Sequence, residues 1–187
     1  NIGYFNLHGV KDGPNWYGQK DFYSNSQGPD YPIALKPAMF NEKTPSPKII
    51  FTEACYGANV IQKNNGDAIS LKSVDHGTSS FIGSTCIAYG SLKPPLIAAD
   101  FLAAAFWEKV FAGEPTGYAL MQAKLSLAEE MIRQQGFLDG EDQKTILSFI
   151  HYGDPLGVYD EYPSMPKPLL RAKSHPKVRT LSDSEME

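Results

Sequence analysis

The sequence has few of the features that mark several large protein classes. It contains only two cysteines, Cys55 and Cys86, among 187 residues, which excludes a disulfide-stapled scaffold and a four-cysteine zinc site. Apolar runs such as 94–99 and 101–107 fall far short of the roughly 20 residues that span a bilayer, so no membrane span is expected. Because 17 basic residues are offset by 21 acidic ones, no general positive field attracts nucleic acid, and no nucleic-acid partner is expected.

The amino-acid composition is typical of a globular protein. Hydrophobic residues make up 42% of the chain and aromatic residues 12%, which argues against disorder and against a coiled coil. The length suits one domain with a sizeable core. Proline and basic residues dominate the end of the chain, so we divide it into a domain at 1–162 and a tail or linker at 163–187.

The hydrophobic pattern predicts strands that alternate with helices. Short apolar or β-branched segments indicate strands, namely 2–7, 48–52, 68–71 and 80–83. Apolar residues at helical spacing predict longer helices at 98–112 and 116–135, which Gly113 and Gly136 end. A shorter apolar segment covers 146–150. This order favours an α/β fold in which helices cover a mostly parallel sheet.

A long segment at 11–47 separates the first two strands. Its six prolines exclude long helices, and irregular segments of this length usually serve a function. The segment also holds Trp16, Tyr17, Tyr23 and Tyr31. We expect an ordered covering loop whose aromatic side chains either pack on the sheet or contact a substrate.

Two reactive side chains directly follow apolar strands. His8 follows the segment 2–7 and Cys55 comes shortly after 48–52, and the carboxyl ends of parallel strands are where open α/β sheets bind ligands. A helix expected at 56–63 would place the thiol at a helix N-terminus, which favours the thiolate. Cys55 is then a candidate nucleophile, His8 a proton donor, and the amides of Gly9 and Cys55 oxyanion donors. The alternative is a small buried cysteine and a structural histidine.

Four short blocks resemble the caspase-like clan of cysteine peptidases, and the gingipain family most closely. The first two blocks are the strand ending in His8-Gly9 and, 47 residues after the histidine, Glu53-Ala54-Cys55. The segment 80–85 is similar to the family's strand after the catalytic cysteine, and 152–156 to its late Gly-Asp-Pro-x-Leu turn. The resemblance implies a caspase-like three-layer sandwich with a mostly parallel sheet, lacking its first strands in this chain. It also implies a catalytic His8 and Cys55 with Gly9 in the oxyanion hole.

The same resemblance suggests residues that bind the substrate. Glu53 resembles an acidic residue at the base of the first specificity pocket in related peptidases, where it would suit Arg or Lys before the scissile bond. The segment that begins at Ser84 resembles the pocket wall, and Asp100 follows this segment. Ser84 and Asp100 are therefore also candidates for binding the substrate. Glu53 is equally compatible with a helix cap or an ion pair, and Asp100 with an ordinary acidic residue at a helix N-terminus.

Other residues are weaker candidates. His76-Gly77 repeats the His-Gly pair but follows Cys55, which fits the family's order poorly, and Cys86 suits a buried thiol on a strand. No histidine has partners at metal-ligand spacing, so no structural zinc or other cofactor is expected. The resemblance leaves calcium open, through the three aspartates of the long loop, although their spacing matches no calcium-loop pattern.

The leading hypothesis is a cysteine endopeptidase whose partner is a peptide or protein substrate. The alternatives are a catalytically inactive caspase-like domain that serves as an interaction scaffold, and a domain that cleaves only its own precursor. We expect the missing first strands to belong to the N-terminal part of the same precursor, which would then be a partner of this chain. The resemblance favours a secreted or cell-surface location.

Overall fold

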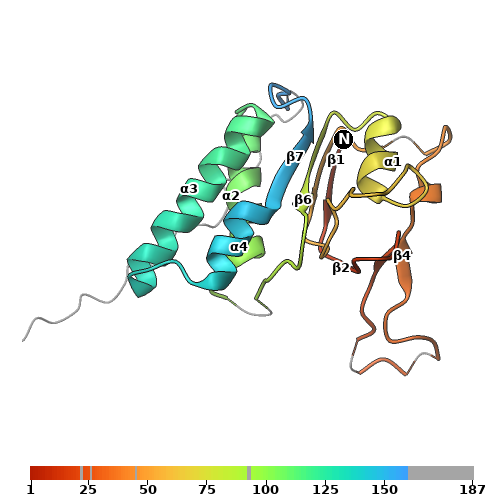
Figure 1. Cartoon of the computed structure of the whole chain (residues 1–187), viewed down its shortest axis with the longest axis horizontal. Coiled ribbons are helices and arrows are strands. Elements are labelled where there is room, and N and C mark those ends of the chain that lie inside the picture. Colours follow the sequence, from red (N-terminus) through yellow and green to blue (C-terminus); the bar gives the residue numbers. More distant parts are fainter. Residues whose placement is uncertain (22, 26, 45, 92–93, 160–187) are drawn as a thin grey trace, which may run out of the picture.

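The computed structural model describes residues 1–159 apart from 22, 26, 45, 92 and 93. The tail expected at 163–187 lies outside the described residues. The described part has a mixed α/β fold, with a mostly parallel sheet and four α-helices (Figure 1). The α/β class predicted from the alternation of strands and helices is therefore confirmed.

A four-stranded sheet forms the centre of the fold. Its strands, in spatial order, are β1 (Ile2–Phe5), β5 (Ile49–Thr52), β6 (Ser80–Ser84) and β7 (Phe149–Gly153). The first three run parallel, whereas β7 pairs antiparallel with β6. The carboxyl ends of β1, β5 and β6 consequently meet at one edge of the sheet.

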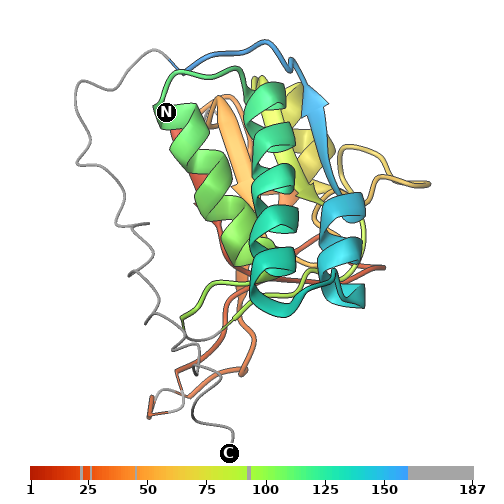
Figure 2. The ribbon, with the colours of Figure 1, turned by 90° about the vertical axis from the view of Figure 1, so that its left-hand side faces the viewer.

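Helices and a small second sheet cover the two faces. One face is covered by α2 (Ala98–Phe111), α3 (Thr116–Gln135) and α4 (Gly140–Ser148), which Figure 2 shows side by side. The opposite face carries α1 (Ile69–Asp75) and a three-stranded sheet. That sheet and its following 3-10 helix comprise β2 (His8–Gly9), β3 (Trp16–Tyr17), β4 (Ile33–Leu35) and η1 (Pro37–Met39). No helix of the described part is long and apolar enough to cross a membrane.

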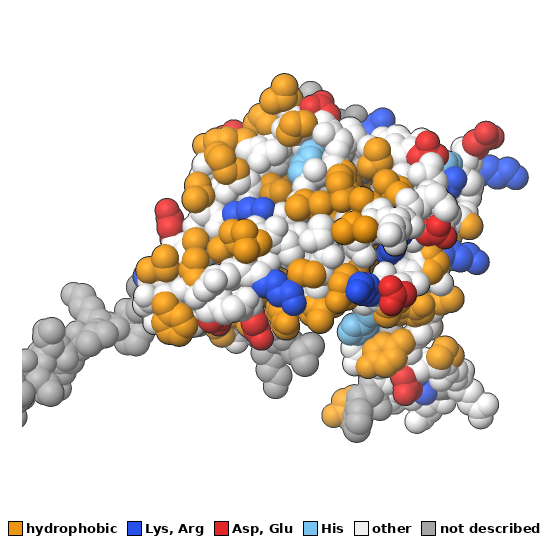
Figure 3. Space-filling view, in the orientation of Figure 1, with side chains coloured by type: hydrophobic (Ala, Val, Ile, Leu, Met, Phe, Trp, Pro, Cys, Tyr) orange, Lys and Arg blue, Asp and Glu red, His pale blue; other side chains and the backbone are white. Residues whose placement is uncertain are grey.

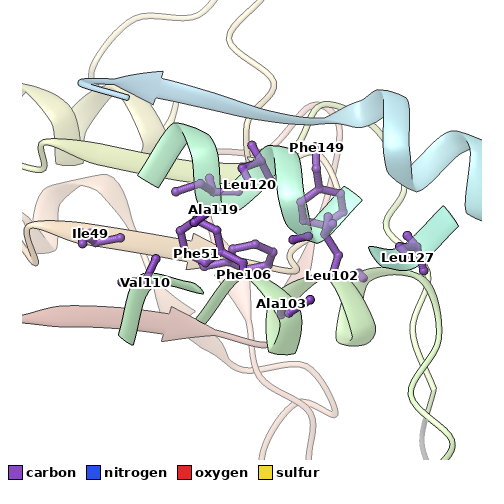
Figure 4. Close-up of a cluster of buried hydrophobic side chains, with 14 of the residues drawn as sticks. Ile49, Phe51, Leu102, Ala103, Phe106, Val110, Ala119, Leu120, Leu127 and Phe149 are labelled. Atoms are coloured by element: carbon purple, nitrogen blue, oxygen red, sulfur yellow. The ribbon is translucent and has the colours of Figure 1, made fainter. Parts of the chain in front are cut away.

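The central strand β5 is buried on both faces, as its unbroken apolar sequence predicts. Phe51 faces the helices, where its ring lies 5.2 Å from that of Phe106 and 5.5 Å from that of Phe149 (Figure 4). Ile50 points the other way, into a cluster that includes Trp16. Successive residues of a strand face opposite sides, so β5 joins the two halves of the core.

The helix at 116–135 is confirmed at both ends, and the helix predicted at 98–112 ends one residue earlier. Gly136 ends α3 in the left-handed conformation, with a φ of 85°, which glycine adopts without a steric penalty. Asp139 then begins α4, because its carboxylate accepts the amides of Glu141 and Asp142.

Two local predictions are wrong. The segment 68–71, expected to be a strand, belongs to α1, because its buried residues Ile69, Ser70 and Ser73 recur at helical rather than alternating spacing. The helix expected at 56–63 is a series of turns. Tyr56 and Gln62 have φ angles of 58° and 57°, which lie in the left-handed region and cannot continue a right-handed helix.

The late Gly-Asp-Pro turn has a structural role. The Ser80 hydroxyl donates to the Asp154 carbonyl at 2.9 Å, and the Thr116 hydroxyl lies 2.9 Å from that of Ser80 and 3.1 Å from Nε2 of His151. Burial lowers the pKa of His151. These bonds tie β6, β7 and the start of α3 together, at the opposite end of β6 from the candidate site.

Candidate active site

Cys55 lies in a tight turn at the carboxyl end of β5. The Thr52 hydroxyl donates to the Phe5 carbonyl at 3.2 Å, which ties the end of β5 to the end of β1. The Tyr56 amide donates to the Cys86 carbonyl at 2.8 Å, which ties the turn to the segment after β6. The backbone around Cys55 is therefore held from both neighbouring strands.

The His8-Gly9 pair lies directly against this turn. A methyl group built on Gly9 would lie 2.0 Å from the carbonyl oxygen of Cys55 and 3.2 Å from its amide nitrogen. Only glycine allows two backbones to approach this closely. Two blocks separated by 47 residues in the sequence are thus in contact.

Both reactive side chains line one cavity of about 200 Å³ at this edge of the sheet. Its walls come from the ends of β1 and β5, from the segment after β6 and from the first turn of α2. The lining residues are Asn6, Leu7, His8, Glu53, Cys55, Ala88, Tyr89, Gly90, Ser91, Ala99 and Asp100. The cavity brings together four of the predicted site residues: His8, Cys55, Glu53 and Asp100.

Each member of the proposed dyad contacts a neighbour other than its partner. Nε2 of His8 lies 3.0 Å from the side-chain oxygen of Gln19, and the Tyr31 ring meets the imidazole edge-on at a centroid distance of 5.2 Å. The Cys55 thiol donates to the Ala88 carbonyl at 3.6 Å. The thiol and the imidazole face the same cavity, and catalytic hydrogen bonds commonly tighten only when substrate binds.

The environment of Cys55 differs from the one predicted. No helix follows it, so the argument that a helix N-terminus favours the thiolate does not hold. The turn offers a different feature: among the described residues, no acceptor takes the Cys55 backbone N–H. This amide is available to donate to an oxyanion next to the sulfur.

Two carboxyl groups lie side by side at the base of the cavity. Glu53 is 8% exposed, and its Oε1 accepts the hydroxyl of Tyr4. The Asp100 carboxylate accepts a hydrogen bond from the Ser91 amide and lies in the first turn of α2. This position is compatible both with a pocket acid and with an ordinary acidic residue at a helix N-terminus. The pKa of Glu53 is raised to about 8: burial raises it most, the hydrogen bond from Tyr4 lowers it, and the adjacent Asp100 raises it. Glu53 is therefore largely protonated at neutral pH.

Gly90 leaves the Asp100 carboxylate accessible from the cavity. A methyl group built on Gly90 would lie 2.5 Å from Oδ2 of Asp100. A larger residue would cover the carboxylate, so the glycine leaves Asp100 open to a bound group.

We expect the substitution Glu53→Gln to flatten the pH dependence of stability. Between pH 4.5, the ordinary pKa, and about 8, the folded state holds a proton that the unfolded state releases, so stability falls as the pH rises. For one proton, the free energy of unfolding falls by up to about 1.4 kcal/mol for each pH unit in this range. Glutamine keeps the acceptor for Tyr4 but cannot ionise, so this slope should disappear. Urea denaturation at several pH values between 5 and 8 measures it.

The matched control for this prediction is Glu42→Gln, which changes an exposed glutamate. The free energy of unfolding of this variant should follow the wild type at every pH. Equal slopes for Glu53→Gln and the wild type would contradict the raised pKa of Glu53.

Three other sequence candidates lie outside the cavity. Ser84, predicted to bind substrate, is fully buried, and its hydroxyl donates to Ser148 at 2.9 Å, because it faces the end of α4 rather than the cavity. This assignment is corrected. Cys86 is half-buried and follows β6 rather than lying on it. His76 ends α1, where its ring contacts the Lys72 carbonyl.

A wider hollow of about 720 Å³ adjoins the turn that follows Cys55. Lys11, Asp12, Tyr56 and Thr85 are among its lining residues, whereas Cys55 is not. Among the residues that the structure describes, no three His, Cys, Asp or Glu side chains gather in a way that suits a metal ion. Calcium binding stays a prediction.

Sequence reasoning missed two side chains that contact the predicted pair. Gln19 belongs to the long segment at 11–47 and reaches His8 across 11 residues. Tyr4 reaches Glu53 across 49 residues. Both contacts join residues that are distant along the chain, and no local sequence pattern predicts either of them.

Comparison with known proteins gives no relative. No family model, no curated protein and no solved structure matches the chain. The function is therefore argued from the site and its chemistry.

Proposed function

We propose that the chain is a cysteine endopeptidase with a caspase-like arrangement, similar to that of the gingipain family. One observation carries the proposal: His8 and Cys55, from the ends of two parallel strands, line the same cavity. A thiol, an imidazole and an available amide converging on one small cavity are the groups that acyl transfer requires.

The reaction follows from these groups. His8 takes the thiol proton of Cys55 as the sulfur attacks the scissile carbonyl carbon, and the resulting oxyanion accepts hydrogen bonds from the Cys55 amide and, in the proposed arrangement, from the Gly9 amide. His8 gives a proton to the leaving amine as the peptide bond breaks, which leaves a thioester on Cys55. Water then attacks the thioester with His8 as the base, and the carboxylic acid product and the free thiol are released.

The two acidic residues support a preference for a basic residue before the scissile bond. The pKa of Glu53 is raised to about 8, and Asp100 lines the same cavity. A guanidinium or ammonium group entering the cavity would favour ionisation of Glu53 and would pair with the carboxylate oxygens that face it.

Cleavage of a panel of fluorogenic peptides tests the proposal. We expect hydrolysis of peptides ending in Arg or Lys, and none of those ending in Asn or Asp. Iodoacetamide should abolish the activity in proportion to the alkylation of Cys55, measured by mass spectrometry of the digested protein.

The contrary result is equally specific. No hydrolysis of any peptide, together with a Cys55 that alkylates no faster than Cys86, would contradict catalysis and favour the interaction scaffold. Cleavage that persists after complete alkylation of Cys55 would place the nucleophile elsewhere.

A further inference from the structure

The segment that carries Gln19 and Tyr31 is an ordered two-stranded ribbon. Beyond β3 and β4, the Gly18 amide donates to the Pro32 carbonyl at 2.9 Å and the Lys20 amide to the Asp30 carbonyl at 2.8 Å. These bonds extend the antiparallel pairing through residues 18–20 and 30–32. The ribbon projects from the sheet edge where β1 ends, and hydrophobic side chains cover part of it (Figures 1 and 3).

The register of the ribbon places Gln19 opposite Tyr31. One backbone bond joins Gly18 to Pro32 and another joins Lys20 to Asp30, so the pair between them has its side chains together on the other face. That face points to His8: the Gln19 oxygen lies 3.0 Å from Nε2 and the Tyr31 ring meets the imidazole edge-on. One side chain from each strand therefore contacts the imidazole.

The base of the ribbon is fixed in the core. Trp16 on β3 is 4% exposed, and its ring lies 5.7 Å from that of Phe5 and 6.3 Å from that of Phe81. The same strand pairs with β2, with His8 opposite Tyr17. The ribbon and the histidine thus share one rigid support, which limits their relative motion although Gln19 itself is exposed.

The contact is a hydrogen bond in only one of the two neutral tautomers of His8. An amide oxygen is only an acceptor, so Nε2 must donate to it, and a neutral imidazole then has its lone pair on Nδ1. A proton taken up at Nδ1 is the one that passes to the leaving amine. After that uptake Nε2–H still donates to Gln19, so the contact favours one ring orientation in both protonation states.

We propose that Gln19 is a positioning residue for His8, which it holds in the Nε2–H tautomer with Nδ1 free for proton transfer. The inference rests on the proposed function, since it assigns His8 the exchange of a proton. The long segment at 11–47 then contributes to catalysis through the histidine, in addition to packing on the sheet.

Gln19→Ala and Gln19→Glu in the full chain test the inference. We expect Gln19→Ala to lower kcat about tenfold or more, with KM little changed, because the ring loses its orientation. Glutamate keeps an acceptor oxygen at the same distance, so Gln19→Glu should restore kcat. Its carboxylate also favours imidazolium, so the kinetic pKa assigned to His8 should rise. Gln27→Ala, an exposed glutamine of the same segment, should leave kcat and the pH profile unchanged.

Nitrogen-15 NMR of the His8 ring gives a readout that needs no activity. We expect the Nε2–H tautomer in the wild type and a mixture of tautomers in Gln19→Ala. If hydrolysis depends on Cys55 but Gln19→Ala keeps the wild-type kcat, pH profile and tautomer, the inference is overturned and the proposed function stands. If no Cys55-dependent hydrolysis exists, the proposed function fails and the inferred role in catalysis fails with it, whatever the tautomer.

Discussion

Replacing Cys55 with alanine should lower kcat for peptide hydrolysis by at least about a thousandfold. The variant loses the atom that forms the thioester, whereas the cavity, the available amide and the carboxyl pair remain. Residual hydrolysis would come only from water bound in the same cavity. The side chain is half-buried and makes one weak hydrogen bond, to the Ala88 carbonyl, so the fold should tolerate the change. Steady-state kinetics on the best peptide of the panel, with circular dichroism as the check on folding, measure both.

Cys86→Ala is the matched control for this prediction. Cys86 is also a free, half-buried thiol, but it does not line the cavity that holds His8. Its variant should hydrolyse peptides within about twofold of the wild-type rate. Equal losses in the two variants, or retained activity in Cys55→Ala, would exclude Cys55 as the nucleophile.

Replacing Gly9 with alanine should lower kcat/KM about a hundredfold. The added methyl group would lie 2.0 Å from the Cys55 carbonyl oxygen, where real contacts need more than 3 Å. The methyl carbon is bonded directly to the Cα of residue 9 and the oxygen belongs to the backbone, so neither can rotate away. The His8 strand and the Cys55 turn must therefore move apart by about 1 Å, and displacements of that size lower rates by about a hundredfold. Kinetics together with the thermal unfolding temperature would show whether the site or the whole fold is affected.

Gly18→Ala controls for the replacement of glycine itself. A methyl group there would meet Pro32 and Ala34 at 3.8 and 3.9 Å, which are ordinary contacts. We expect its kcat/KM to stay within about threefold of the wild type. If Gly9→Ala retained full activity, the two blocks could not be packed as closely as the proposed oxyanion hole requires.

Several features of the protein follow from local sequence. The segment 48–52 reads as a buried strand because all its strand residues are apolar or β-branched, and both faces of β5 are indeed buried. The helix 116–135 follows from helical spacing of apolar residues and from Gly136 as a terminator. His8 and Cys55 could be singled out because each follows such a strand, and parallel strands bring their carboxyl ends to one edge.

Short segments were less well determined by the sequence. Four residues at 68–71 cannot distinguish the period of a strand from that of a helix, and burial of Ile69 and Ser73 on one side decided for the helix. The turns after Cys55 depend on left-handed residues such as Tyr56. The Tyr56 amide is bonded to the Cys86 carbonyl, and a contact over that separation has no local signal.

The electrostatics and the orientation of the site were decided by tertiary structure. The sequence identified Glu53 and Asp100 as separate acidic candidates, but the raised pKa of Glu53 depends on its burial beside Asp100. Ser84 shows the reverse, since the resemblance of its segment to a pocket wall suggested a substrate contact, whereas the side chain is fully buried away from the cavity. The sequence by itself determined which reactive residues end the strands. Only packing between distant segments decided what each of them contacts, because partners such as Gln19 and Tyr4 are set by the register of strands and not by spacing along the chain.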